Sequence, residues 1–264
     1  GLFVDNRLLY DIWVVLNKLN IKHNRYWYID TSMSDIQTLS QNQFPPLLRE
    51  IPDMPHSLYM RGSLPPDGHK LLAVVGSRRM SCYGKEACEH LIRGLAGQPV
   101  SIVSGLALGI DATAHRAALN ARLHTIAIPG SGIDDASLYP RSNARLAQEI
   151  LNAGGALLSE EIPGTKAASY MFPKRNRIMA GMSDAVLVIE AGEKSGTLIT
   201  AKLTVEYNRE LLIVPHSIFS EGGTGGHIFM KLGGAPVRTS ADILDTLNLE
   251  ETEAGASTTV LAPE

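Results

Sequence analysis

From Lys70 onward, short apolar runs alternate regularly with longer stretches of helical pattern, and this alternation restricts the chain to one class of fold. The apolar runs are nearly uninterrupted, which is typical of strands covered on both faces in a parallel sheet. The expected strands are residues 71–77, 100–105, 124–130, 155–160, 184–192 and 210–216. The expected helices are residues 83–95, 110–121, 143–152, 176–182 and 198–207. This order predicts an α/β fold with a doubly wound, mostly parallel sheet and helices on both faces.

The two ends of the chain have a different character. Residues 1–45 are expected to form a partial N-terminal segment of one helix and short extended pieces. Residues 46–249 are expected to form the main domain, entered through a proline-rich connector at 43–66 that lies on the sheet edge. Residues 250–264 are polar and are expected to be a flexible tail. The first residue is Gly rather than Met, so both ends are expected to be cuts or linkers.

Composition excludes some classes of protein. The 264 residues carry a formal charge of -3, with a pI of about 6.3, so a polyanion would have to be held by a local patch of cations. The two cysteines have no metal-ligand spacing, which fits reduced thiols and a cytoplasmic location. No apolar run is long enough for a membrane span, and the eight histidines are scattered. We therefore expect no membrane, no metal and no cofactor.

Small residues follow nearly every expected strand, at the edge of the sheet where ligands of such folds bind. Glycine in these loops lets backbone N–H groups approach an anion, and a following helix adds a favourable dipole. A single loop of this kind is more often a simple turn, but several at one edge favour a phosphate-bearing ligand. The expected phosphate-cradling residues are Gly76, Ser77, Gly105, Gly130, Ser131, Gly132, Ser195, Gly196 and Thr197. Their spacing is neither a dinucleotide fingerprint nor a Walker motif.

Cations accompany these loops. Three of them lie next to the expected start of a helix at residue 176, where positive charge opposes the helix dipole. Local rules of this kind are broken most often for function. The alternative is a solvated face whose cations pair with Glu160 and Glu161. The candidate anion-binding cations are Arg78, Arg141, Lys174, Arg175, Arg177 and Lys194.

Candidate catalytic groups are few. Asp111 and His115 lie four residues apart on one expected helix face and could form an acid–base pair, although a helix cap with a packed histidine is the commoner arrangement. Glu190 ends an expected strand and could bind a ribose or orient Lys194 or Arg175.

A set of longer motifs resembles the DprA/Smf family of DNA-processing proteins. The motifs run in family order from about Phe44 to Leu247. They are "FPPLLREI" with "LYMRG", "AVVGSR", "SGLALGIDATAH", "GSGIDDASLYPRSN", "LLSEEIPG", "FPKRNRIMAGMSDAVLVIEA", "KSGTLITAKLTVE" and "IVPHSIFSEGGTGGHIFMKLGG". The resemblance implies an extended Rossmann-like domain that binds single-stranded DNA, helps to load the RecA recombinase in natural transformation, forms a homodimer and is not an enzyme.

The resemblance also implies roles for individual residues. The family's DNA-contacting set falls on Arg78, Arg141 and the three cations of "FPKRNR". Two positions depart from the family pattern: Leu108 stands where a basic residue is common, and Pro129 where an apolar residue is usual. Many members have a winged-helix-like C-terminal domain, which we expect this sequence to lack, and we expect only a short N-terminal piece before the main domain.

The leading hypothesis is a protein that holds the backbone of single-stranded DNA in a cationic crevice at the carboxyl edge of the sheet. Tyr139, Tyr170 and Phe172 are the candidates for stacking on bases. The alternative hypothesis is an enzyme resembling the lysine-decarboxylase-like phosphoribohydrolases, with Glu190 or Glu206 as acid or base. Against it, "EKSGT" matches their "PGGxGT" loop only in part. A third possibility is a scaffold that only joins subunits and a recombinase.

Overall fold

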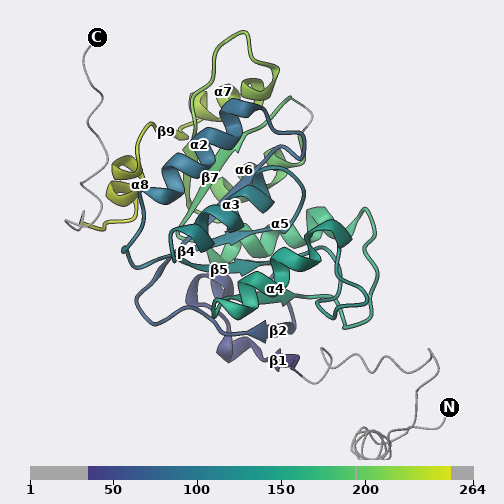
Figure 1. Cartoon of the computed structure of the whole chain (residues 1–264). Coiled ribbons are helices and arrows are strands. Elements are labelled where there is room, and N and C mark those ends of the chain that lie inside the picture. The colour runs from purple at the N-terminus through teal and green to yellow at the C-terminus, as the bar shows by residue number, and fades with distance from the viewer. Residues whose placement is uncertain (1–34, 194, 251–264) are drawn as a thin grey trace, which may run out of the picture. The chain divides into compact units, whose positions relative to one another are not determined.

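The computed structural model describes residues 35–193 and 195–250, and in this part of the chain one mixed sheet of nine strands forms the centre (Figure 1). The strand order is β1-β2-β6-β5-β4-β3-β7-β8-β9, and all pairs are parallel except β1–β2 and β2–β6. The strands are β1 Gln37–Leu39, β2 Leu58–Gly62, β3 Lys70–Gly76, β4 Val100–Ser104, β5 His124–Ala127, β6 Ala156–Ser159, β7 Ala185–Glu190, β8 Glu210–Ile213 and β9 Ala235–Pro236.

Helices cover both faces of this sheet (Figure 1). The α-helices are α2 Cys82–Arg93, α3 Ile110–Asn120, α4 Ala144–Asn152, α5 Met171–Met182, α6 Thr197–Glu206, α7 Thr224–Lys231 and α8 Ser240–Thr246. Short 3-10 turns are η2 Gln41–Gln43, η3 Pro46–Glu50, η4 Arg141–Asn143 and η5 Glu221–Gly223. The predicted α/β fold with a doubly wound, mostly parallel sheet is therefore confirmed.

The central strand β3 shows why its sequence is apolar throughout. Leu72 and Val74 point into a core formed with α2, α3 and α8, whereas Leu71, Ala73 and Val75 point into the opposite core, formed with α5 and α6. Both faces are covered by helices, so both sets of alternating positions must be apolar.

The order of the strands places a crevice at one point of the sheet. From β3 the chain moves outward through β4, β5 and β6, and then returns to place β7 on the other side of β3. The connections on the two sides of β3 therefore leave in opposite directions, and a crevice opens beyond the carboxyl ends of β3 and β7. Ligands of open α/β sheets bind at such a switch point.

One predicted boundary is wrong in a way that bears on the site. The helix expected from residue 176 begins at Met171, because Pro173 lies in its first turn, where a missing N–H group leaves no hydrogen bond unmade. Lys174 therefore ends the first turn, and Arg175 and Arg177 lie beyond it. The argument that all three cations oppose the dipole at the helix start does not hold, since that effect fades within one turn.

The connector at 43–66 is ordered, as expected, and part of it belongs to the sheet. Within it η3 packs against α5, and β2 pairs with β6. The strand β1 precedes the expected domain boundary at residue 46 and pairs with β2. Most of the expected N-terminal segment and tail, residues 1–34 and 251–264, lie outside the described residues. Within the described ranges no helix is long and apolar enough to cross a membrane.

Candidate functional site

A cleft of about 740 Å³ opens at the switch point between β3 and β7. Its walls come from the loop after β3, the start of α3, α5 as far as Met179 and the start of α6. Three arginines and one carboxylate contribute the charge among the described lining residues. The polar and charged lining residues are Ser77, Arg78, Arg79, Asp111, Arg175, Asn176, Ser195, Thr197 and Thr200.

Arg175 belongs to the wall of the cleft and is only 7% exposed. Its Nη1 donates hydrogen bonds to the carbonyl oxygens of Gly105, at 2.6 Å, and of Ile128, while its Nε donates to Asn176 Oδ1 at 3.1 Å. Burial lowers the pKa of the guanidinium to about 10, against the opposite influence of Asp111. The side chain therefore stays charged at neutral pH and is fixed by carbonyl groups.

The glycines around the cleft have an internal explanation. A Cβ atom on Gly105 would lie 2.1 Å from Arg175 Nη1, and one on Gly130 would lie 2.6 Å from Cδ1 of Phe172. A Cβ on Gly76 would lie 2.6 Å from Ile110 of α3. At these three positions glycine makes room for the protein's own side chains. Close approach to an anion is therefore not needed to explain glycine at these three positions.

Arg78 presents its charge at the cleft surface. It is exposed, and its Cζ lies 4.8 Å from the centre of the Phe172 ring, a cation–π distance. The Phe172 ring in turn lies 5.9 Å from that of Tyr139. A small pocket beside the cleft is lined by Arg78, Arg175, Phe172 and Tyr139, together with Leu108. Two predicted cations and two predicted aromatic residues therefore meet at one place.

Arg141 lies at the margin of this place. It follows Pro140, which lines the small pocket, and its Nη1 donates a hydrogen bond to the Asp135 carbonyl oxygen. Tyr170 is exposed just before α5. Lys194 lies outside the described residues.

Lys174 and Arg177 are engaged with carboxylates, which was the alternative interpretation of these cations. Lys174 Nζ lies 3.2 Å from both Glu160 Oε2 and Glu161 Oε1, and 42% of its side chain remains exposed. Burial lowers the pKa of Lys174, but the two carboxylates outweigh it and raise the pKa overall. Arg177 Nη2 lies 2.7 Å from Glu160 Oε2, and its side chain is only 12% exposed. Of the two, Lys174 is the one that a ligand could reach.

The other predicted loop residues divide into two groups. Ser195, Gly196 and Thr197 line the cleft, and the Cβ position of Gly196 faces open space. Ser131 is fully buried, and its Oγ accepts a hydrogen bond from the Tyr139 N–H at 3.2 Å. Ser131 therefore supports the loop that carries Tyr139.

Of the candidate catalytic groups, His115, Glu190 and Glu206 are engaged away from the cleft. His115 is fully buried with Nδ1 2.8 Å from Thr125 Oγ1, and burial lowers its pKa to about 3. Glu190 Oε2 accepts hydrogen bonds from Ser81 N–H and Oγ at 3.0 and 2.9 Å, and Glu206 forms an exposed pair with Lys202. The Asp111–His115 pair is therefore not an acid–base pair, and neither glutamate lines the cleft in the described part of the chain.

Asp111 was considered as the partner of His115, but it lies in the wall of the cleft. It lies in the first turn of α3, is 6% exposed and lines the cleft, with Oδ2 3.4 Å from the Ala107 N–H. Burial raises its pKa, against the opposing influence of Arg175 and of Arg78. Sequence reasoning also missed Asn176 and Thr200, because a polar residue within a helix gives no sign of which face meets a cleft.

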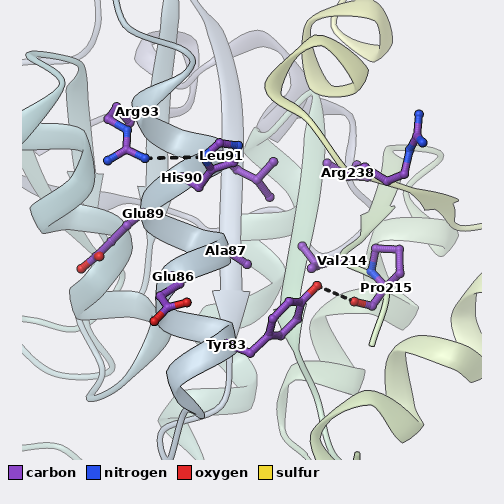
Figure 2. A pocket seen from close by; sticks show the side chains of 11 residues that line it. Tyr83, Glu86, Ala87, Glu89, His90, Leu91, Arg93, Val214, Pro215 and Arg238 are labelled. Atoms are coloured by element: carbon purple, nitrogen blue, oxygen red, sulfur yellow. Dashed lines mark hydrogen bonds between the residues drawn. The ribbon is translucent and has the colours of Figure 1, made fainter. Parts of the chain in front are cut away.

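A second groove, of about 590 Å³, runs along α2 on the side of β8 and β9 (Figure 2). Tyr83 at its rim donates a hydrogen bond to the Pro215 carbonyl oxygen at 2.8 Å. Glu86 and Glu89 line it together with Arg93 and Arg238, so its charges are mixed. It contains none of the predicted site residues that the structure describes.

These features define a class: a doubly wound α/β protein with an arginine-bearing cleft, edged by aromatic rings, at its switch point. Residues 35–248 match the family described as DNA recombination-mediator protein A, and the chain belongs to this family. The protein Smf of Escherichia coli K12 is 41% identical over 204 residues, which cover 77% of this chain and 54% of that protein. The chain thus spans about half the length of this relative.

Two solved structures share the fold. The X-ray structure of DNA processing protein A from Streptococcus pneumoniae superposes with a TM-score of 0.75 at 36% identity, covering 84% of this chain and 77% of that one. The structure of DNA processing protein A from Helicobacter pylori superposes with a TM-score of 0.70 at 30% identity, covering 81% of this chain and 95% of that one. That second structure was described for the way its protein binds single-stranded DNA.

Proposed function

We propose that this protein is a non-catalytic, single-stranded DNA-binding protein that holds the DNA backbone at the switch-point cleft. The observation that carries the proposal is the meeting of Arg78 and Arg175, from separate elements, beside the rings of Phe172 and Tyr139. Arginines bind phosphates, and aromatic faces stack on bases of any sequence. The single-stranded DNA binding described for the H. pylori relative supports the same assignment.

The contribution of each cation to phosphate binding depends on its exposure and on whether a carboxylate already pairs with it. Arg78 is exposed and makes the first phosphate contact, while Arg175 adds a fixed positive charge from the wall of the cleft. Lys174 joins when a phosphate displaces Glu160 and Glu161, and Arg141 extends the path at the margin. Leu108 takes a place in the small pocket where a further cation would add a contact. Ser195, Gly196 and Thr197 offer backbone and hydroxyl donors on the opposite wall.

The wider role follows the family. In this proposal the DNA-bound protein acts in the cytoplasm as a homodimer, loads the RecA recombinase onto DNA and serves DNA uptake or recombination. Measuring the mass in solution tests the dimer, and pull-down of purified RecA tests the partner. The hydrolase alternative gains no support from Glu190 or Glu206, whose carboxylates are held outside the cleft.

The direct test is a salt series of binding to single-stranded and double-stranded oligonucleotides. Phosphate contacts make the logarithm of affinity fall with the logarithm of salt, by about 0.7 per contact for single strands. Replacing both Arg78 and Lys174 with Ala removes two contacts and should weaken binding and lower that slope by about 1.4. Arg93→Ala removes one exposed charge at the far end of α2 and should leave the slope unchanged. An unchanged slope in the double variant would reject this cleft as the interface.

A further inference from the structure

Asp111 is an acidic residue in a cleft whose other described charges are arginines. It is 6% exposed and lies in the first turn of α3. A carboxylate beside a phosphate site weakens the binding of any anion, so its presence there opposes the proposed function. Such a conflict with a local rule at a binding site calls for a functional explanation.

The carboxyl group of Asp111 contacts the backbone of the loop before α3. It accepts a long hydrogen bond from the Ala107 N–H, at 3.4 Å, and a further one from the backbone of Gly105. The guanidinium of Arg175, its strongest cationic neighbour, is instead fixed by the carbonyl oxygens of Gly105 and Ile128. The position of Arg175 therefore depends on carbonyl groups, and Asp111 adds a carboxyl group to the wall of the cleft. Burial raises the pKa of this carboxyl, whereas Arg175, the backbone N–H groups and Arg78 favour its charged form.

Apart from two arginines, the described titratable groups that influence or neighbour Asp111 are neutral. On the same helix His115 is buried and neutral at physiological pH, because burial lowers its pKa to about 3. The Cys88 thiol of α2 is also neutral, because burial raises its pKa and the nearby charge of Asp111 acts in the same direction. Arg78 from the loop after β3 and Arg175 from α5 are the cations that face the carboxylate.

We infer that Asp111 is a specificity-determining residue, which reduces the preference of the cleft for the doubly charged phosphomonoesters of free nucleotides over the singly charged phosphodiesters of a DNA strand. The arginines of the cleft attract a second phosphate charge, and the carboxylate of Asp111 repels it. At separations of several ångströms and an effective dielectric constant of about 20, one extra unit of repulsion changes affinity by about tenfold or more. This inference rests on the proposed function and names the chemical form of phosphate that Asp111 disfavours.

The test uses two probes that differ by one charge: thymidine 5′-monophosphate and its methyl phosphodiester. Each displaces a fluorescent oligothymidylate at about pH 8, where a phosphomonoester carries close to two charges. For the wild-type protein, the ratio of the two affinities sets the reference. In Asp111→Asn the ratio of the two affinities should shift toward the monophosphate by about tenfold or more.

Two controls isolate the position of the charge. Glu86→Gln removes one carboxylate from the exposed face of α2, in the groove of Figure 2, and should leave the ratio as in the wild type. Asp111→Glu keeps the charge and should also keep the wild-type ratio. Asp111→Ser is a second variant without the carboxylate, and it should show the same shift of the ratio if Asp111→Asn does not fold.

The inference is overturned if Asp111→Asn leaves the ratio of the two affinities unchanged. That outcome is compatible with salt-dependent binding of the oligothymidylate that weakens in the Arg78 variant, so it leaves the proposed function standing. Absence of oligothymidylate binding at low salt would overturn the proposed function and this inference together.

Discussion

Gly105→Ala is the substitution that tests most sharply how the cleft is built. Gly105 is buried, and an added Cβ would lie 2.1 Å from Nη1 and 2.4 Å from Cζ of Arg175. Such separations are far below contact distance, so the guanidinium must move by roughly 1 Å or more. It would then lose its hydrogen bonds to the Gly105 and Ile128 carbonyl oxygens.

The size of the effect follows from these two costs. Overpacking a core position typically costs about 1–3 kcal/mol, and a hydrogen bond to a charged group contributes about 1.5–3 kcal/mol. The costs overlap, since both arise from one displaced side chain. We expect Gly105→Ala to lower the free energy of unfolding by about 2–5 kcal/mol.

Two assays measure this prediction. Urea denaturation followed by circular dichroism gives the free energy of unfolding, and the salt dependence of oligothymidylate binding reports the displaced charge, with a slope lower by about 0.7. For stability the matched control is Gly196→Ala: its Cβ position is open, and its backbone already has helical angles, φ -58 and ψ -21. This control should change stability by less than about 0.5 kcal/mol. Gly105→Ala with wild-type stability and an unchanged slope would refute the packing argument.

Three further substitutions have defined outcomes. Glu161→Gln removes one of the carboxylates that hold Lys174, and an exposed ion pair is worth up to about 1 kcal/mol, so affinity for single-stranded DNA should rise by about two- to fivefold in equilibrium titrations. Phe172→Leu removes an aromatic face from the cleft and should weaken binding by about 1–3 kcal/mol with little change in salt slope, if one base stacks there. Burial lowers the folded-state pKa of His115 to about 3, whereas the unfolded chain has the ordinary value of about 6.5. Between these pH values only the unfolded state takes up the proton, so the stability that this neutral histidine contributes is full above about pH 6.5 and is lost as the pH falls below it. His115→Gln should therefore show a smaller drop of the urea midpoint between about pH 7 and pH 5, and an equal drop would contradict this reasoning.

The fold was predictable because its signal is local. An uninterrupted apolar run such as 71–77 requires cover on both faces, and the alternation of such runs with helical stretches leads to a doubly wound sheet. The start of α5 was not predictable in this way. Pro173 suggests a helix boundary, although a proline also fits within the first turn of a helix. The antiparallel edge formed by β1 and β2 also gave no periodic pattern, since each strand is short.

The site was predictable only in part, because its contacts join residues far apart in the chain. Arg175 meets the carbonyl group of Gly105 across 70 positions of sequence, and no local pattern indicates that pairing. The same holds for the ion pairs of Lys174 and Arg177. These two cations were predicted to bind an anion, but they contact the protein's own carboxylates. Residue types at strand ends located the cleft, whereas the freedom of each cation depended on its tertiary neighbours.

The central claim is that a DNA phosphate occupies the cleft at the carboxyl ends of β3 and β7. A crystal structure of the protein with a short oligothymidylate measures this directly. We predict a backbone phosphate within hydrogen-bonding distance of Arg78 or Arg175, with a base against the ring of Phe172. A strand bound instead along the α2 groove of Figure 2, with the cleft free of phosphate, would contradict the claim.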